Sequence, residues 1–134
     1  KISKILIPKS VGLCDVATFK NCVNLTSIVF EDGGDVPLYV GGDLWLENTQ
    51  VTILVLPFKT YRIRGYWRRG SNLNTLYVKS TIPPILEHGW GDNPDTCDLY
   101  VPIGCKEVYA SATNWGSFRT ITEYDFDLNP NNVH

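Results

Sequence analysis

The amino-acid sequence predicts a right-handed solenoid, a β/α superhelix whose short parallel strands stack into one concave sheet opposite an irregular convex side. The first supporting observation is a repeated motif, apolar-x-x-apolar-x-apolar. It occurs in the segments 2–7, 25–30, 51–56 and 73–78, and in 96–101 with a departure only at the first position. Because one such strand cannot bury its inward residues alone, neighbouring repeats must stack. We therefore expect five strands, the last near 97–101.

The spacing of the motif is the second observation. Its central residues are Ile5, Ile28, Leu54, Leu76 and Leu99, which lie 23, 26, 22 and 23 residues apart. This period is typical of leucine-rich repeats. The sequence thus predicts a leucine-rich repeat solenoid.

An aromatic column provides an independent check. Nine residues before the last four motif centres stand Phe19, Trp45, Trp67 and Trp90. Three residues after each aromatic come Cys22, Asn48, Gly70 and Asn93, which are small or amide residues suited to a tight turn. We expect the four aromatic side chains to be mostly buried along the convex side.

Composition sets limits on the class of protein. The chain has 134 residues, of which 43% are hydrophobic and 19% charged, which suits one domain with a buried core. Its net charge of −2 gives no general electrostatic reason to bind nucleic acid or an anionic membrane. No apolar run approaches the roughly 18 residues of a transmembrane helix. Since the chain begins at Lys1 within an apolar strand pattern, we expect it to be part of a longer or processed protein.

The first repeat carries a set of residues with recognisable spacing, namely Ile5, Ile7, Pro8, Val11, Ala17, Phe19, Cys22, Asn24, Leu25 and Ile28. This set resembles the leucine-rich repeat unit of BspA-like bacterial surface proteins. Later repeats depart from the unit, with Asp43 and Gly65 in place of Ala17. The resemblance covers residues 1–102. It implies a cell-surface or secreted bacterial protein that acts in adhesion or recognition through the concave sheet.

The segment 103–128 resembles the closing segment of such arrays and is expected to form a C-terminal helical cap. Residues 105–112 place Val108, Tyr109 and Ala112 on one face of a short helix. After it, Trp115, Phe118 and Ile121 are suited to cover the open edge of the last strand. Residues 129–134 are polar, and we expect a flexible tail there.

Nothing in the sequence indicates catalysis, a metal site or a cofactor. The cysteines Cys14, Cys22, Cys97 and Cys105 show no Cys-x-x-Cys spacing, and neither His88 nor His134 lies in a nucleophile or metal motif. The expected state of the cysteines is a thiol; Cys97 and Cys105 could form a disulfide only if the chain folds back tightly. The sequence therefore predicts a protein that is not an enzyme.

Two charged segments are interpreted as surface features and not as ligand sites. The acidic segment 31–35 lacks the alternating ligands of a calcium loop, so we interpret it as a solvated loop whose glycines absorb the longer second repeat. The segment 59–69 contains Lys59, Arg62, Arg64, Arg68 and Arg69 and no acid. Because the repeat pattern places Trp67 in the core column and Tyr61 opposite Leu13, this segment is interpreted as a basic convex patch and not as a nucleic-acid site.

The concave sheet is the expected binding surface. Strand alternation directs one column of side chains outward, namely Leu6, Val29, Val55, Tyr77 and Tyr100, with Ile53 beside it. We predict a ligand site formed by Tyr77, Tyr100, Val55, Ile53 and Val29. Two alternatives stay open: β-propensity alone favours valine and tyrosine on a sheet, and the cap could cover the strip through Trp115 and Phe118.

The predicted function is a non-catalytic binding or adhesion module that recognises a protein or a glycan, outside the cell or on its surface. The alternative is a structural spacer or cap of a larger repeat array with no ligand of its own. The sequence names no ligand and gives no oligomeric state.

Overall fold

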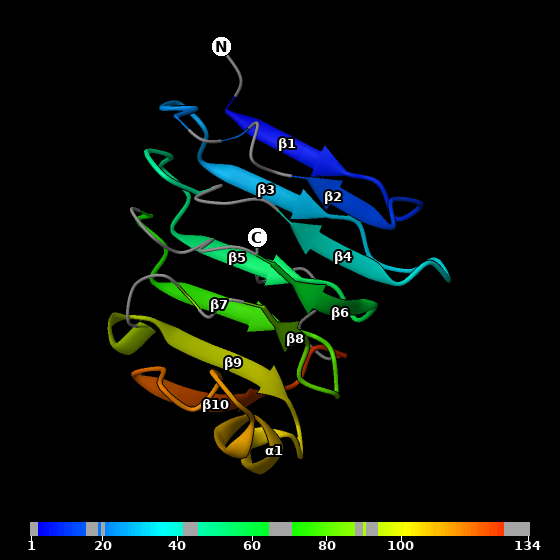
Figure 1. Ribbon diagram of the computed structural model, residues 1–134, viewed down its shortest axis with the longest axis vertical. Helices are drawn as coiled ribbons and strands as arrows, with labels where there is room; N and C mark the ends of the chain where they lie inside the picture. Colours follow the sequence, from blue (N-terminus) through cyan, green and yellow to red (C-terminus); the bar gives the residue numbers. More distant parts are fainter. Residues whose placement is uncertain are drawn as a thin grey trace.

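The computed structural model describes residues 3–15, 19, 21–41, 46–64, 71–87, 90 and 94–127. Within these residues the chain forms a β-solenoid of about four turns, built mostly of parallel strands and containing little helix (Figure 1). The prediction of a solenoid of stacked parallel strands is confirmed. No helix in the described part of the chain is long and apolar enough to cross a membrane.

The motif segments form the first sheet. Its strands are β1 (Lys4–Ile7), β3 (Ser27–Phe30), β5 (Ile53–Leu56), β7 (Thr75–Val78), β9 (Asp98–Pro102) and β10 (Thr120–Tyr124). Parallel pairing joins β1 to β3 and, separately, β5 to β7, β9 and β10, while β3 lies beside β5 (Figure 1). In this register Ile5 faces Ile28, and Leu54, Leu76 and Leu99 follow one another across the sheet. The motif centres therefore stack directly.

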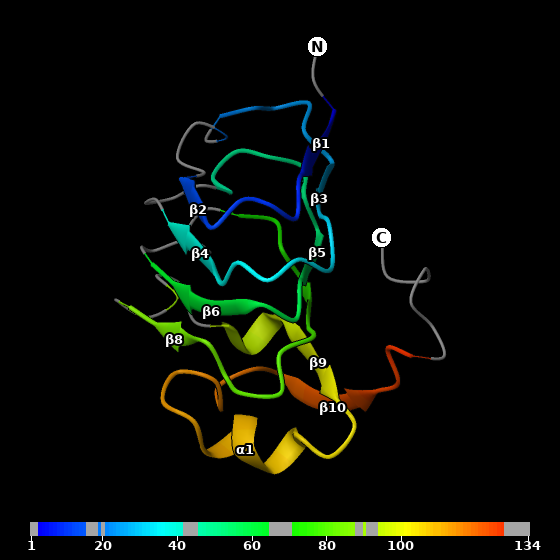
Figure 2. The same ribbon diagram turned by 90° about the vertical axis from the view of Figure 1, so that its right-hand side faces the viewer.

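The expectation of an irregular convex side is wrong. A second parallel sheet, in the order β2-β4-β6-β8, lies on that side (Figure 2), with strands β2 (Leu13–Asp15), β4 (Leu38–Gly41), β6 (Thr60–Ile63) and β8 (Ile85–Leu86). The inward side chains Leu38, Val40, Ile63 and Leu86 alternate with more exposed ones, which is the pattern of a half-buried strand. These strands were missed because they carry no shared motif and two of them are shorter than four residues.

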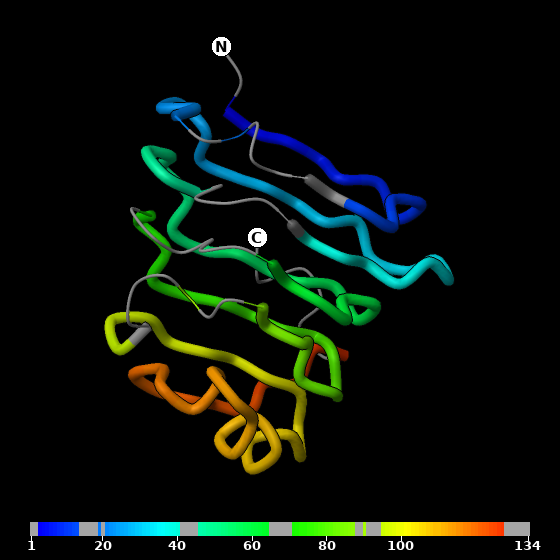
Figure 3. Tube along the Cα trace, viewed as in Figure 1, coloured from blue at the N-terminus to red at the C-terminus, as the bar shows by residue number. Residues whose placement is uncertain are grey.

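The core lies between the two sheets. From β1 to β8 the chain alternates between them, so each turn of the solenoid adds one strand to each sheet (Figure 3). Buried residues from the first sheet, including Leu54 and Leu56, belong to one cluster with Ile63 of the second.

The aromatic column is confirmed as core at its last position only. Trp90 is buried and Phe19 is only partly buried. Trp45 and Trp67 lie outside the described residues.

The C-terminal residues add a sixth strand to the first sheet where five were expected. Strand β10 pairs with β9 in parallel, with Ile121 facing Leu99, and so covers the edge of the last motif strand. Before it come the short helices η2 (Pro94–Thr96) and α1 (Lys106–Ser111), the latter burying Tyr109. The edge is thus covered by a strand, whereas Trp115 and Phe118 pack edge-on against Trp90, with ring centres 5.0 Å and 4.9 Å from it.

Candidate binding surfaces

The outward face of the first sheet brings two of the predicted ligand residues into direct contact. Tyr77 on β7 and Tyr100 on β9 are paired in the register of the sheet. Both side chains point outward, because the residues before and after them along each strand are buried in the core. Their rings stack with centres 4.5 Å apart and planes 14° from parallel. The column predicted from strand alternation is thus present at these positions.

The same tyrosines are partly covered by the chain itself. Tyr124 lies edge-on to Tyr77 and Tyr100, with ring centres 5.3 Å and 6.0 Å away, and Phe126 lies edge-on to Tyr77 at 6.2 Å. Burial raises the pKa of the Tyr77 phenol, and the neighbouring Tyr100 and Tyr124 raise it further. Cover was expected from Trp115 and Phe118, but it comes from Tyr124 and Phe126, which no repeat pattern indicated.

The remaining predicted site residues differ in accessibility. Ile53 is 44% exposed and offers its side chain to solvent, whereas Val55 is only 7% exposed and offers little. Val29 is half-buried and Leu6, at the N-terminal end of the column, is exposed. The accessible part of this surface, here called the tyrosine face, is therefore formed by Leu6, Val29, Ile53, Tyr77 and Tyr100.

An ion pair closes the C-terminal border of the tyrosine face. Arg119 donates two hydrogen bonds to the Asp98 carboxylate, at 2.9 Å and 2.8 Å, and Thr120 donates a third at 2.8 Å. The Arg119 bonds are the main reason why the pKa of Asp98 falls to about 2. Asp98 is therefore occupied in joining β9 to β10 and is not available as a ligand group.

The basic segment is only partly described, because Arg68, Arg69 and Trp67 lie outside the described residues. Arg64 is exposed, and Arg62 forms an ion pair with Glu87 at 3.0 Å while its guanidinium lies 5.8 Å from the centre of the Tyr39 ring. Tyr61 was expected opposite Leu13, but Leu13 pairs with Tyr39, and a register shift between Leu38 and Tyr39 leaves Tyr61 exposed while Thr60 points inward. Arg62 is thus held on the second sheet by its neighbours.

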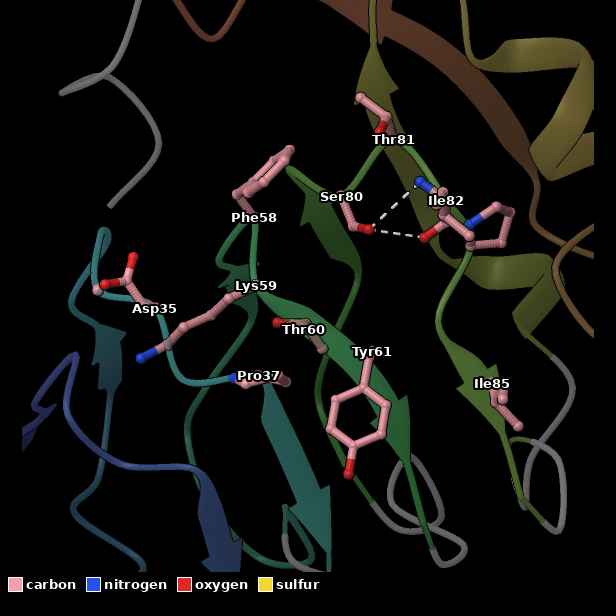
Figure 4. A pocket seen from close by; sticks show the side chains of 12 residues that line it. Asp35, Pro37, Phe58, Lys59, Thr60, Tyr61, Ser80, Thr81, Ile82 and Ile85 are labelled. Carbon is pink, nitrogen blue, oxygen red and sulfur yellow. Dashed lines mark hydrogen bonds between the residues drawn. The ribbon is translucent and has the colours of Figure 1, made fainter.

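The structure also contains a groove that no sequence pattern predicted. It lies where the chain passes from the first sheet to the second, and its volume is about 610 Å³ (Figure 4). The lining residues are Gly34, Asp35, Pro37, Phe58, Lys59, Thr60, Tyr61, Ser80, Thr81, Ile82, Pro83 and Ile85. Phe58 is 65% exposed and Ile82 is 76% exposed. We call this surface the corner groove.

The walls of the corner groove are held by hydrogen bonds of the turn between β7 and β8. The Ser80 hydroxyl donates to the Ile82 carbonyl at 2.6 Å and accepts from the Ile82 amide at 3.3 Å (Figure 4). Below it the Ser80 carbonyl accepts a hydrogen bond from the buried Tyr109 hydroxyl at 2.6 Å, and burial raises the pKa of that phenol. Apolar residues in turns next to Pro57, Pro83 and Pro84 were the available sequence signal.

Thr60 is the unusual residue of the corner groove. Its side chain lines the groove, it is only 2% exposed, and its hydroxyl has no hydrogen-bond partner within the described part of the chain. Buried hydroxyls nearly always have a partner. In the view of Figure 4 Thr60 lies between Ser80 and Pro37.

The described residues contain no metal-binding arrangement. They contain no group of three or more His, Cys, Asp or Glu side chains placed to hold a metal ion. Cys97 and Cys105 donate thiol hydrogen bonds to the carbonyls of Asp98 and Thr81, at 3.7 Å and 3.8 Å. Burial raises the pKa of the Cys105 thiol, which disfavours the reactive thiolate. His88 and His134 lie outside the described residues.

In comparisons with known proteins, no protein-family model matches the sequence, and no curated protein matches it significantly.

Proposed function

We propose that this chain is a non-catalytic binding module that recognises a protein or a glycan through the tyrosine face. The observation that carries the proposal is the outward strip that runs from exposed Leu6 to the stacked Tyr77 and Tyr100. Stacked tyrosines present a large, rigid contact area, and their hydroxyls can bond to a ligand or to water. A parallel sheet holds such side chains at fixed spacing.

The proposal includes the class and the location of the protein. The repeat period and the resemblance of residues 1–102 to BspA-like units support a leucine-rich repeat array of a bacterial surface or secreted protein, and the helix α1 supports a C-terminal helical cap. This support is by analogy with a family, because a fold does not determine a function.

The second candidate is a structural spacer or cap of a larger array with no ligand of its own. The packing of Tyr124 and Phe126 against Tyr77 favours it, since these rings serve the same chain. If that is their whole role, substitutions on the tyrosine face change stability and no binding.

Immobilised host matrix proteins and a glycan array test the proposal. Ile53→Glu places a charge on the exposed part of the tyrosine face without touching the tyrosine cluster, and we expect it to abolish binding that the parent chain shows. Val108→Glu on α1 is the matched control, because Val108 is as exposed as Ile53. If no probe binds the parent chain, or if Ile53→Glu leaves the affinity unchanged, the tyrosine face is not the binding surface.

A further inference from the structure

We propose that the corner groove is a second recognition site, which binds an extended peptide segment of a partner protein through the apolar side chains and one basic residue of that peptide. This site lies at the turns between the sheets and does not depend on the tyrosine face. Within the described part of the chain, three features of the groove support it: its exposed apolar walls, the unsatisfied hydroxyl of Thr60 and the exposed, unpaired carboxylate of Asp35.

The walls of the corner groove expose large apolar side chains to solvent. Phe58 lies in the turn after β5, Ile82 in the turn after β7, and Ile85 on β8. All three are large, exposed hydrophobic residues that line one groove. Pro37 and Pro83 line it as well. A volume of about 610 Å³ lies within the usual range of about 300–1,000 Å³ for ligand pockets. Contiguous exposed apolar surface of this kind marks binding sites in soluble domains.

Thr60 supplies a polar group that becomes available to a ligand through a change of side-chain rotamer, because its hydroxyl is buried in the free chain. Since the Thr60 hydroxyl has no hydrogen-bond partner in the described structure, a hydrogen bond to a ligand would satisfy it without breaking a bond within the chain. A change of the χ1 rotamer exchanges the hydroxyl and the methyl group at the groove wall. A backbone carbonyl or amide of a bound peptide is suited to this single hydroxyl, which both donates and accepts.

Charge selects the kind of peptide. Asp35 lines the groove, is exposed and forms no ion pair or hydrogen bond within the described residues. Its neighbour Asp32 is paired with Lys79, and the Lys59 ammonium donates to the Lys9 carbonyl. The Asp35 carboxylate is therefore free to pair with a lysine or an arginine of the ligand.

A peptide fits this lining better than a glycan does. The lining contains no asparagine, glutamine, arginine or histidine, and Asp35 is its one carboxylate. A sugar carries many hydroxyl groups, and those that face Ile82, Ile85 and the prolines would have no hydrogen-bond partner. Extended peptides, by contrast, place alternate apolar side chains in grooves lined by aromatic residues and gain few but specific backbone hydrogen bonds.

Selection of random linear peptides displayed on phage, with the full chain as the target, tests the proposal. Enriched peptides should combine apolar residues with a lysine or an arginine. When one of them is synthesised and titrated, methyl NMR signals of Ile82, Ile85 and Thr60 should shift while those of Ile53 stay in place. A lack of enrichment, or shifts confined to the tyrosine face, would overturn the proposal.

Variants then assign the roles. We expect Thr60→Val to weaken binding about tenfold, the loss of one hydrogen bond, and Thr60→Ser to restore it. Ile82→Asp should abolish binding, whereas Ile103→Asp, a comparably exposed isoleucine outside the groove, should not. Asp35→Asn should remove the preference for basic peptides. Binding that is unaffected by Ile82→Asp contradicts the proposal, and so does a glycan that shifts the same methyl signals when it is titrated in place of the peptide.

Discussion

The two ends of the solenoid carry the same motif and bury it to different extents. At the C-terminal end the inward residues Leu99 and Val101 of β9 are fully buried, because β10 and the residues around Trp115 enclose them. At the N-terminal end Ile5 and Ile7 of β1 are only half-buried, although they face buried residues of β3. In a solenoid the contribution of a strand to stability is thus set by its neighbours as well as by its own residues.

The largest expected effect concerns the covering of the C-terminal end. Trp115→Ala removes an indole that is almost fully buried, packs edge-on against Trp90 and Tyr109, and donates a hydrogen bond to the Pro84 carbonyl at 2.9 Å. We expect the free energy of unfolding to fall by about 3–5 kcal/mol, measured by urea denaturation. A loss below about 1 kcal/mol, typical of a surface site, would show that this end is not closed by packing.

A matched pair of substitutions compares the ends directly. Leu99→Ala and Ile5→Ala truncate equivalent motif centres, one fully buried and one half-buried. We expect a loss of about 2–5 kcal/mol for Leu99→Ala and roughly half as much for Ile5→Ala, because less area is withdrawn from water there. Equal losses in urea denaturation would refute the difference between the ends.

A smaller effect is expected from one hydroxyl beneath the corner groove. Tyr109→Phe keeps the ring and removes the hydrogen bond to the Ser80 carbonyl. The buried carbonyl then lacks its partner, which costs about 1–3 kcal/mol. Thermal denaturation checks the loss, with Tyr61→Phe on the exposed surface as the control that should leave the melting temperature unchanged.

The mildest expected effect depends on pH. The folded-state pKa of Asp98 is about 2 against a usual 3.8, so the Asp98–Arg119 pair stabilises the chain above pH 3.8 and is lost as the pH falls toward 2. Acid titration of stability should therefore show a component in this window that Asp98→Asn removes. Because the pair is partly exposed, the effect is modest. An identical acid profile for parent and variant would contradict the assignment.

The first sheet could be predicted from the sequence because a single parallel register repeats along it. Ile28, Leu54 and Leu76 recur at nearly constant spacing, and strand alternation then places Tyr77 beside Tyr100. The second sheet could not be predicted in this way, since its strands are short and the register shifts at Leu38 and Tyr39. The repeat spacing stacks the turn after β5 on the turn after β7, but it does not fix the turn conformations that leave Phe58 and Ile82 exposed, so the corner groove emerges only in three dimensions.

The one-dimensional arrangement of the strands has a consequence for exchange of backbone amide protons with solvent. Each strand pairs only with its neighbours in its own sheet, so opening proceeds inward from an end, and the half-buried β1 offers the lowest free energy of opening. Amides of β1 and β3 should exchange first and those of β7 and β9 last, which gives a gradient of protection along the axis. A partner that docks on the N-terminal strands would flatten this gradient even from a site far from the amides that report it.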